Sequence, residues 1–114
     1  MAAENRLATY GTRALGKPDS DQLRDLDGRW RSGKIWGRLL DAEWGSDLGF
    51  PGLILGEHAY EIPVSLFESA DLPKHWERLD ALEGEGYQRV TTIVDVDGEQ
   101  IEAFVYALAR RLVG

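Results

Sequence analysis

The sequence predicts a mixed α+β domain, in which one main helix packs on a small and mostly antiparallel β-barrel. Two long β-branched segments flank Asp97-Gly98, a residue pair strongly typical of a tight hairpin turn. Residues 71–83 have the pattern of an amphipathic helix, and several shorter strand-like segments precede them. A barrel covered by a helix protects the hydrogen-bonding edges of that many strands.

The first half of the chain is expected to hold short strands between polar and glycine-rich segments. Residues 5–10 form a first strand that stops at a glycine. The polar segment 17–33 follows. Asp19 or Ser20 in this segment is placed to cap a short helix or turn through Leu26. Further strands are expected at 34–41, 53–55 and 59–67.

Alternation indicates which side chains of these strands share a face. In 34–41, one face holds Ile35, Gly37 and Leu39. In 59–67, one face holds Tyr60, Ile62, Val64 and Leu66. Pro63 lies inside this second run. Because proline has no backbone N–H to donate, it indicates an edge strand or a bulge.

The segment 71–83 is the clearest helix in the chain. Asp71 is placed at its N-cap, and Pro73 lies in its first turn. Gly84 and Gly86 follow its last residue and end it. The strands of the closing hairpin are expected at 87–96 and 99–108.

Length and charge limit the classes of function. A chain of 114 residues is expected to form a single domain over 1–114. Its net charge of -7 argues against nucleic acid and anionic membrane as partners, because both require a basic surface. No apolar run approaches the roughly 18 residues that a membrane-spanning helix needs. We expect a soluble, cytoplasmic protein.

Cysteine and histidine usage argues against a metal centre. The absence of cysteine excludes disulfides, thiolate metal ligands and a cysteine nucleophile. His58 and His75 are isolated and have no partner at metal-ligand spacing. We therefore expect neither a metal nor another cofactor.

Glu83 is the most informative residue of the predicted helix. At about 100° per residue it lies within roughly 20° of Leu72 and Trp76 on the helical wheel, on the apolar stripe that includes Leu79. A carboxylate partly removed from water has a raised pKa, which makes it a competent general base near neutral pH. Alternatively, Glu83 bends out to water or pairs with a base such as Arg89.

The sequence contains two short motifs, one near its N-terminus and one across the end of the predicted helix. The stretch ATYGTRALG, residues 8–16, has the form Tyr-Gly-Thr-x-x-x-Gly, and LDALEGEGYQRV, residues 79–90, has the form Leu-Asp-x-x-Glu-Gly followed by Tyr-x-Arg. Both resemble the signatures of the γ-glutamylcyclotransferase-like family, also called AIG2-like. EAFVYAL, residues 102–108, resembles the family's late Ala-x-Val-Tyr strand. The likeness spans nearly the whole chain in the expected order.

The resemblance implies a small mixed α/β barrel with one cavity and a small-molecule γ-glutamyl substrate. It makes Glu83 the base that takes a proton from the substrate's α-amine. That amine attacks its own γ-carbonyl, which closes 5-oxoproline and releases an amine or an amino acid. Tyr87 is implied to contact the substrate. The glutamyl part is implied to rest on the backbone amides of a cradle formed by Tyr10, Gly11, Thr12, Arg13, Ala14 and Leu15.

These residue types suit the implied chemistry. The substrate supplies its own nucleophile and the ring closure is intramolecular, so neither cysteine nor metal is needed. Successive backbone N–H groups in a glycine turn can meet an oxyanion or a carboxylate. Gly11 matters because a side chain there would block the close approach of the substrate.

Several positions leave alternatives open. Arg13 stands where the family more often has Leu or Asn, so it either forms a fork for a substrate carboxylate or projects into solvent. Asp80 is expected to bond a backbone amide. Arg89 either holds Tyr87 or Glu83 in place or lies on the strand surface. For Tyr106, and for Trp36 and Trp44, the sequence leaves open whether the side chain only packs against its neighbours or lines the cavity.

Two functions fit the pattern. The first is a γ-glutamylcyclotransferase-like enzyme with Glu83 as general base. The alternative is a module of the same fold that binds a small carboxylate or amine metabolite without turning it over. A third and weaker reading is an interaction protein whose cradle is vestigial.

Overall fold

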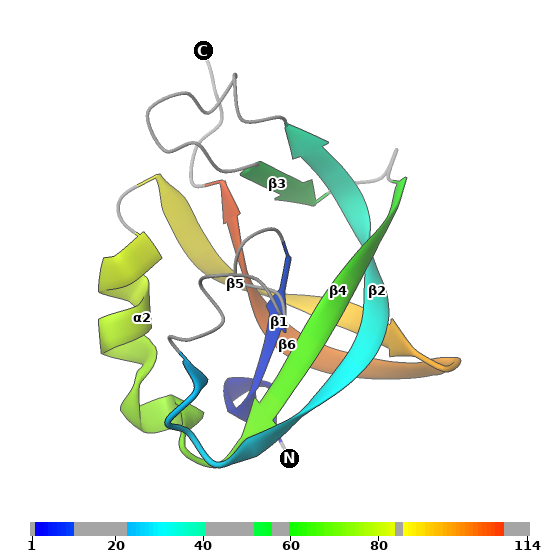
Figure 1. Cartoon of the computed structure of the whole chain (residues 1–114). Coiled ribbons are helices and arrows are strands. Elements are labelled where there is room, and N and C mark those ends of the chain that lie inside the picture. The colour runs from blue at the N-terminus through cyan, green and yellow to red at the C-terminus, as the bar shows by residue number, and fades with distance from the viewer. Residues whose placement is uncertain (1, 11–22, 41–51, 56–59, 84–85, 109–114) are drawn as a thin grey trace.

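The computed structural model describes residues 2–10, 23–40, 52–55, 60–83 and 86–108 (Figure 1). Its strands are β1 (Arg6–Thr9), β2 (Gly28–Leu40), β3 (Gly52–Leu55), β4 (Tyr60–Ser69), β5 (Tyr87–Val96) and β6 (Glu99–Leu108). Its helical segments are the short 3-10 helices η1 (Ala3–Asn5) and η5 (Leu72–Lys74) and the α-helix α2 (Trp76–Glu83). Across these ranges, no helix has the length and apolar character needed to cross a membrane.

Five of the strands close into a barrel. The strand order is β3-β2-β4-β1-β6-β5, and a further pairing of Lys34 with Asp95 joins β2 to β5. The ring is therefore β2-β4-β1-β6-β5, and β3 extends the sheet beyond it from β2. Most pairings are antiparallel, but β1 runs parallel to β6, with Leu7 opposite Phe104. The predicted mixed, mostly antiparallel barrel with one main helix is confirmed.

The closing hairpin is the best-predicted part of the fold. Strands β5 and β6 have the expected bounds, and Val96 pairs with Glu99 next to the turn. Asp97 and Gly98 both have positive φ, 54° and 89°, which is the backbone conformation of a two-residue turn that matches the strand twist. The Gly98 N–H also donates to Asp95 Oδ1 over 2.9 Å.

Strand β2 begins at Gly28, well before the strand expected at 34–41. The sequence pattern hides this part because Arg29 and Arg31 make it look like a polar loop. Both arginines instead donate hydrogen bonds to Glu68 on β4, which is 5% exposed. Between them, Trp30 stacks against Phe67 with ring centroids 4.9 Å apart. The polar segment therefore ends as a barrel strand.

The turn through Leu26 is present at its C-terminal end. The Leu26 N–H donates to the Leu23 carbonyl over 3.1 Å. Both leucines are buried, so this turn contributes to the core. The expected caps, Asp19 and Ser20, lie outside the described residues.

Pro63 lies in the half of β4 that has one neighbour among the described pairings. It pairs with Lys34 on β2, whereas β1 lies beside β4 only from Ser65 to Glu68. A missing N–H therefore costs no ladder bond on the second side. The edge position expected from the proline holds locally, although β4 as a whole lies inside the sheet. Tyr60, at the start of the strand, is 69% exposed.

The helix expected at 71–83 is divided into η5 and the α-helix α2, which begins at Trp76. Asp71 is the N-cap residue of η5, but its side chain makes no capping hydrogen bond there, and its Oδ2 accepts one from the backbone N–H of Asp27 over 3.1 Å. The first α-helical bond is instead accepted by the His75 carbonyl from the Leu79 N–H. The predicted stripe is retained, since Leu72, Trp76 and Leu79 are all buried.

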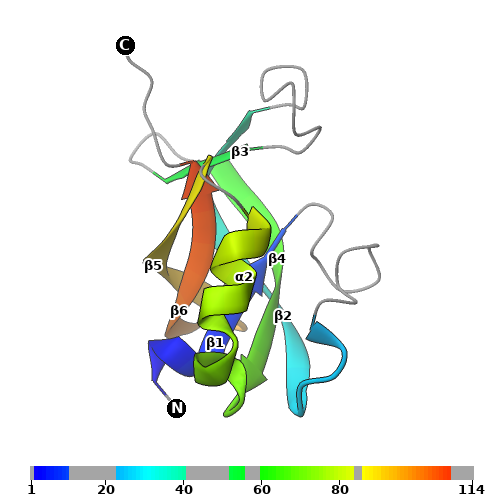
Figure 2. The same cartoon turned by 90° about the vertical axis from the view of Figure 1, so that its left-hand side faces the viewer.

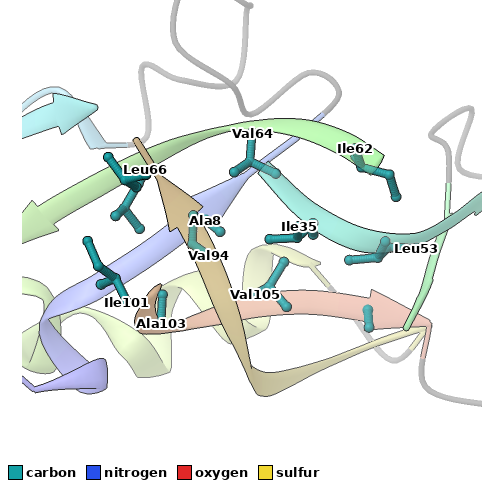
Figure 3. Packing of buried hydrophobic residues seen from close by; sticks show 12 residues of the cluster. Ala8, Ile35, Leu53, Ile62, Val64, Leu66, Val94, Ile101, Ala103 and Val105 are labelled. Carbon is teal, nitrogen blue, oxygen red and sulfur yellow. The ribbon is translucent and has the colours of Figure 1, made fainter. Parts of the chain in front are cut away.

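The buried side chains form two separate clusters. One fills the inside of the barrel, where alternate residues of neighbouring strands point toward one another (Figure 3). It includes Ile35, Val64, Val94 and Val105. The second lies between the barrel and α2, which runs along the outside of β1, β4 and β6 (Figure 2). It includes Leu7, Leu23, Phe67, Trp76, Leu79 and Tyr106.

Barrel closure requires a residue without a side chain at Gly33. A Cβ there would lie 2.8 Å from Val94 Cγ1 and 2.9 Å from the Asp95 carbonyl oxygen, both on β5. We expect Gly33→Ala to lower the free energy of unfolding by about 2 kcal/mol, because the backbone of β5 would have to move. Urea unfolding measures this, with Ser32→Ala on the exposed neighbouring position as the control. Equal stability of the two variants would contradict the close approach of β2 and β5.

Candidate active site

Glu83 is the last residue of α2 and is half-buried. Helix α2 is fixed to the barrel by the buried side chains of Trp76 and Leu79, so the position of Glu83 follows from their packing. The pKa of Tyr87 is raised by its burial and by the negative charge of Glu83. The charge of Glu83 also contributes to the raised pKa of Tyr106. The carboxylate therefore lies within electrostatic reach of two tyrosines, one on β5 and one on β6.

Tyr10 joins the start of the predicted cradle to this region. Its hydroxyl donates to the backbone carbonyl of Tyr106 over 2.6 Å, and its ring packs against the barrel core. Gly11, Thr12, Arg13, Ala14 and Leu15 lie outside the described residues. Tyr10 is the first residue of the predicted cradle. Its hydroxyl bonds to Tyr106, and the charge of Glu83 acts on the same residue of β6.

Asp80 and Arg89 form a two-pronged ion pair next to Glu83. Arg89 Nε donates to Asp80 Oδ1 over 2.9 Å, and Arg89 Nη2 donates to Asp80 Oδ2 over 3.2 Å. The guanidinium also contacts two rings that touch each other edge to face, 4.5 Å from the Trp76 centroid and 4.7 Å from the Phe104 centroid. Asp80 therefore bonds side chains, not the backbone amide expected from the sequence.

Tyr106 completes this cluster from β6. Its hydroxyl donates to Asp80 Oδ1 over 2.6 Å. Burial and this hydrogen bond raise the pKa of Tyr106, so the hydroxyl keeps its proton at neutral pH. Burial acts to raise the pKa of Asp80, but the hydrogen bonds from Arg89 and Tyr106 outweigh it and hold that pKa below its ordinary value. Asp80 is therefore a stable anion in this cluster.

The contact of Tyr106 with Asp80 was not predicted from the sequence, although its signals were present. The Asp97-Gly98 turn fixes the hairpin register, which sets Arg89 opposite Tyr106. Asp80 and Glu83 are three residues apart, so they are neighbours on one helix surface. The docking of α2 on the barrel, which brings the helix to Arg89 and Tyr106, cannot be predicted from these local patterns.

The comparisons with known proteins decide the family. The model of the family described as "Gamma-glutamyl cyclotransferase, AIG2-like" matches residues 7–113. The chain belongs to this AIG2-like family. No curated protein sequence matches it.

Solved structures of AIG2-like and uncharacterised proteins have the same fold. An AIG2-like protein of Mus musculus is 20% identical with a TM-score of 0.73, over 95% of this chain and 79% of that one. An uncharacterised protein of Pyrococcus horikoshii is 25% identical with a TM-score of 0.66, over 96% and 81%. YkqA of Bacillus subtilis is 20% identical with a TM-score of 0.71, over 96% of this chain and 37% of its own. These likenesses support the AIG2-like barrel.

The other candidate residues lie away from this part of the AIG2-like barrel or outside the residues that the structure describes. Trp36 is 43% exposed on the outer face of β2, where Lys34 Nζ lies 6.0 Å from its ring centroid. His75 is half-buried and contacts Arg78, whose Nε lies 3.3 Å from His75 Nδ1. Within the described ranges, no group of three or more acidic or histidine side chains could hold a metal ion. Trp44 and His58 lie outside these ranges.

Proposed function

We propose that this protein is a γ-glutamylcyclotransferase-like enzyme that releases 5-oxoproline from a γ-glutamyl amine or a γ-glutamyl amino acid. The observation that supports this most directly is the position of Glu83. Glu83 is half-buried and its charge acts on Tyr87 and Tyr106, and the Tyr106 carbonyl accepts the hydroxyl of Tyr10, the first residue of the cradle motif. Membership of the AIG2-like family supports the reaction class.

In the proposed reaction, Glu83 acts first as base and then as acid. The substrate's α-ammonium is not a nucleophile until it loses a proton, which the Glu83 carboxylate accepts. The free amine nitrogen then bonds to the γ-carbonyl carbon, and the amide bond to the leaving amine breaks. The departing nitrogen takes up two protons, one returned by the Glu83 carboxylic acid and one given up by the attacking nitrogen as it becomes the lactam N–H. The products are 5-oxoproline and the released amine in its ammonium form, and Glu83 is a carboxylate again.

The remaining site residues are assigned to binding. The backbone N–H groups of Gly11 to Leu15 hold the glutamyl carboxylate or the oxyanion of the carbonyl under attack. Burial and the charge of Glu83 raise the pKa of Tyr87, so its hydroxyl stays protonated and can donate a hydrogen bond to the substrate. Arg13 is proposed to add a charged fork for a substrate carboxylate.

A panel of γ-glutamyl compounds tests this function. We expect 5-oxoproline to form from one or more γ-glutamyl amines or amino acids, measured by liquid chromatography with mass detection. The N-acetyl derivative of the best substrate is the matched control, because its blocked nitrogen cannot attack the γ-carbonyl. It should bind without yielding any cyclised product.

Two results would contradict the proposal. Cleavage of the N-acetyl derivative would mean direct hydrolysis without ring closure. Absence of turnover across the panel, together with a raised melting temperature in the presence of a γ-glutamyl compound, would favour the binding module instead.

A further inference from the structure

One residue of β6 makes hydrogen bonds both to helix α2 and to Tyr10, which follows strand β1. The Tyr106 hydroxyl donates to Asp80 on α2, and the Tyr106 backbone carbonyl accepts the hydroxyl of Tyr10 at the end of β1. Tyr106 is 5% exposed, so its hydroxyl and its carbonyl are largely shielded from water, while the Asp80 side chain is 44% exposed. One buried residue therefore sets the spacing between the helix that ends at Glu83 and the strand that leads into Gly11.

The side of Asp80 that Tyr106 does not reach is held by Arg89. Arg89 makes two hydrogen bonds to the carboxylate, and its guanidinium contacts the rings of both Trp76 and Phe104. Rotation of α2 about its axis would break all of these contacts together. Asp80 and Glu83 lie on neighbouring positions of that helix, so fixing Asp80 also fixes the backbone from which the Glu83 side chain extends.

We propose that Asp80, Arg89 and Tyr106 are positioning residues, which hold the Glu83 carboxylate toward the Tyr10 end of β1 and balance the charge around it. None of the three is assigned to the substrate. The proposal rests on the proposed function in so far as Glu83 is the base, but its central measurement does not require turnover.

Removing the charge of Asp80 or of Arg89 gives a test, because the two substitutions should shift the pKa of Glu83 in opposite directions. The charge of Glu83 acts on Tyr87 of β5 and on Tyr106 of β6. The hydroxyl of Tyr106 also joins the ion pair between Asp80 on α2 and Arg89 on β5. Asp80→Asn removes an anion and leaves the Arg89 cation without its carboxylate partner, so the pKa of Glu83 should fall. Arg89→Gln leaves the Asp80 anion uncompensated, so the pKa of Glu83 should rise. A change of about 0.5 pH unit in each direction is expected for neighbouring charges that water partly screens.

A merely structural ion pair predicts a different result. If the pair only holds the fold together, both variants loosen the site in the same way. Glu83 then meets more water in both, and its pKa moves in the same direction in both. The two readings therefore differ in the sign of one measurement.

The measurement is a carboxyl ¹³C NMR titration of protein labelled in its glutamate side chains, with Glu83 assigned from the spectrum of Glu83→Gln. Lys34→Gln and Glu61→Gln are matched controls, because they break an exposed ion pair of 2.6 Å on the outer face of β2 and β4. They should leave the titration of Glu83 unchanged. Near-ultraviolet circular dichroism checks that each variant is folded.

Tyr106→Phe provides a second test, because this variant keeps the buried ring and removes only the hydrogen bond to Asp80. With an active substrate, we expect kcat to fall about tenfold while KM changes less than threefold, because the base is misplaced and the binding groups remain. Glu83 shifts of equal sign or of zero in the two charge variants would overturn the proposal, as would a wild-type kcat in Tyr106→Phe. If the wild-type protein turns nothing over, the proposed function fails, and the titration still decides this inference.

Discussion

Replacing Glu83 with glutamine is expected to lower kcat for 5-oxoproline release by about a hundred- to ten-thousand-fold, the range that a general base contributes. Glutamine has nearly the same shape and keeps a hydrogen-bonding oxygen, but it cannot accept the ammonium proton. KM should change little, because the glutamyl part of the substrate is assigned to the cradle. Steady-state kinetics with the best substrate of the panel measures both constants.

The matched control is Glu77→Gln, on an exposed position of the same helix. It removes one negative charge from α2 without touching the residues assigned to the reaction, so its kcat should stay within twofold of the wild type. A raised pH should partly rescue Glu83→Gln, because a substrate whose α-amine has already lost its proton in solution no longer needs the base. Full activity of Glu83→Gln would end the assignment of Glu83 as base.

Replacing Glu68 with glutamine is expected to lower the free energy of unfolding by about 2 to 3 kcal/mol. Glu68 is 5% exposed and accepts hydrogen bonds from Arg6 on β1 and from Arg29 and Arg31 on β2. A neutral side chain leaves three like charges close together at one end of the barrel. The cost stays below that of a fully buried pair because these arginines partly reach water.

The effect of Glu68→Gln should depend on pH with a definite sign. Burial acts to raise the pKa of Glu68, but hydrogen bonds from Arg29 and Arg6 and the charge of Arg31 outweigh it and hold that pKa below its ordinary value of 4.5. The folded state therefore binds this proton less readily than the unfolded chain. The stabilisation is complete above about pH 4.5 and is lost as the pH falls through the lower folded pKa.

Urea unfolding at pH 7 and at pH 3 measures this dependence. The difference in stability between the wild type and Glu68→Gln should narrow at the lower pH. Glu61→Gln, which breaks the exposed pair with Lys34, should cost less than about 1 kcal/mol at pH 7. A difference that stays constant with pH would show that the Glu68 charge does not stabilise the fold.

Local patterns predicted the parts of the fold that depend on local physics. The Asp97-Gly98 turn gave the hairpin its bounds and register, because two residues with positive φ specify a tight turn. Helical periodicity placed Leu72, Trp76 and Leu79 in the core and left Glu83 half-buried beside them. Each of these features depends on neighbours within a few residues.

The parts that were missed depend on distant residues. The start of β2 reads as a loop until Glu68, far along the chain, provides a partner for Arg29 and Arg31. Asp71 stands at an N-cap as expected, but its carboxylate accepts the backbone N–H of the distant Asp27 and makes no capping hydrogen bond. The bond between Tyr106 and Asp80 likewise requires the docking of α2 on the barrel. Polar side chains were misread where their partner was far away in the sequence.

The parallel pairing of β1 with β6 has a consequence for how the chain folds. The first strand lies between β4 and the last strand, with Ala8 opposite Val105. During synthesis β1 lacks one of its two neighbours until Glu99–Leu108 have been made, so the barrel cannot close on the ribosome before β6 emerges. Closure also joins segments that are far apart in sequence, which slows folding because the entropy of a long loop is lost before the contact forms. Nascent chains are therefore expected to spend that interval with an open strand edge on β1.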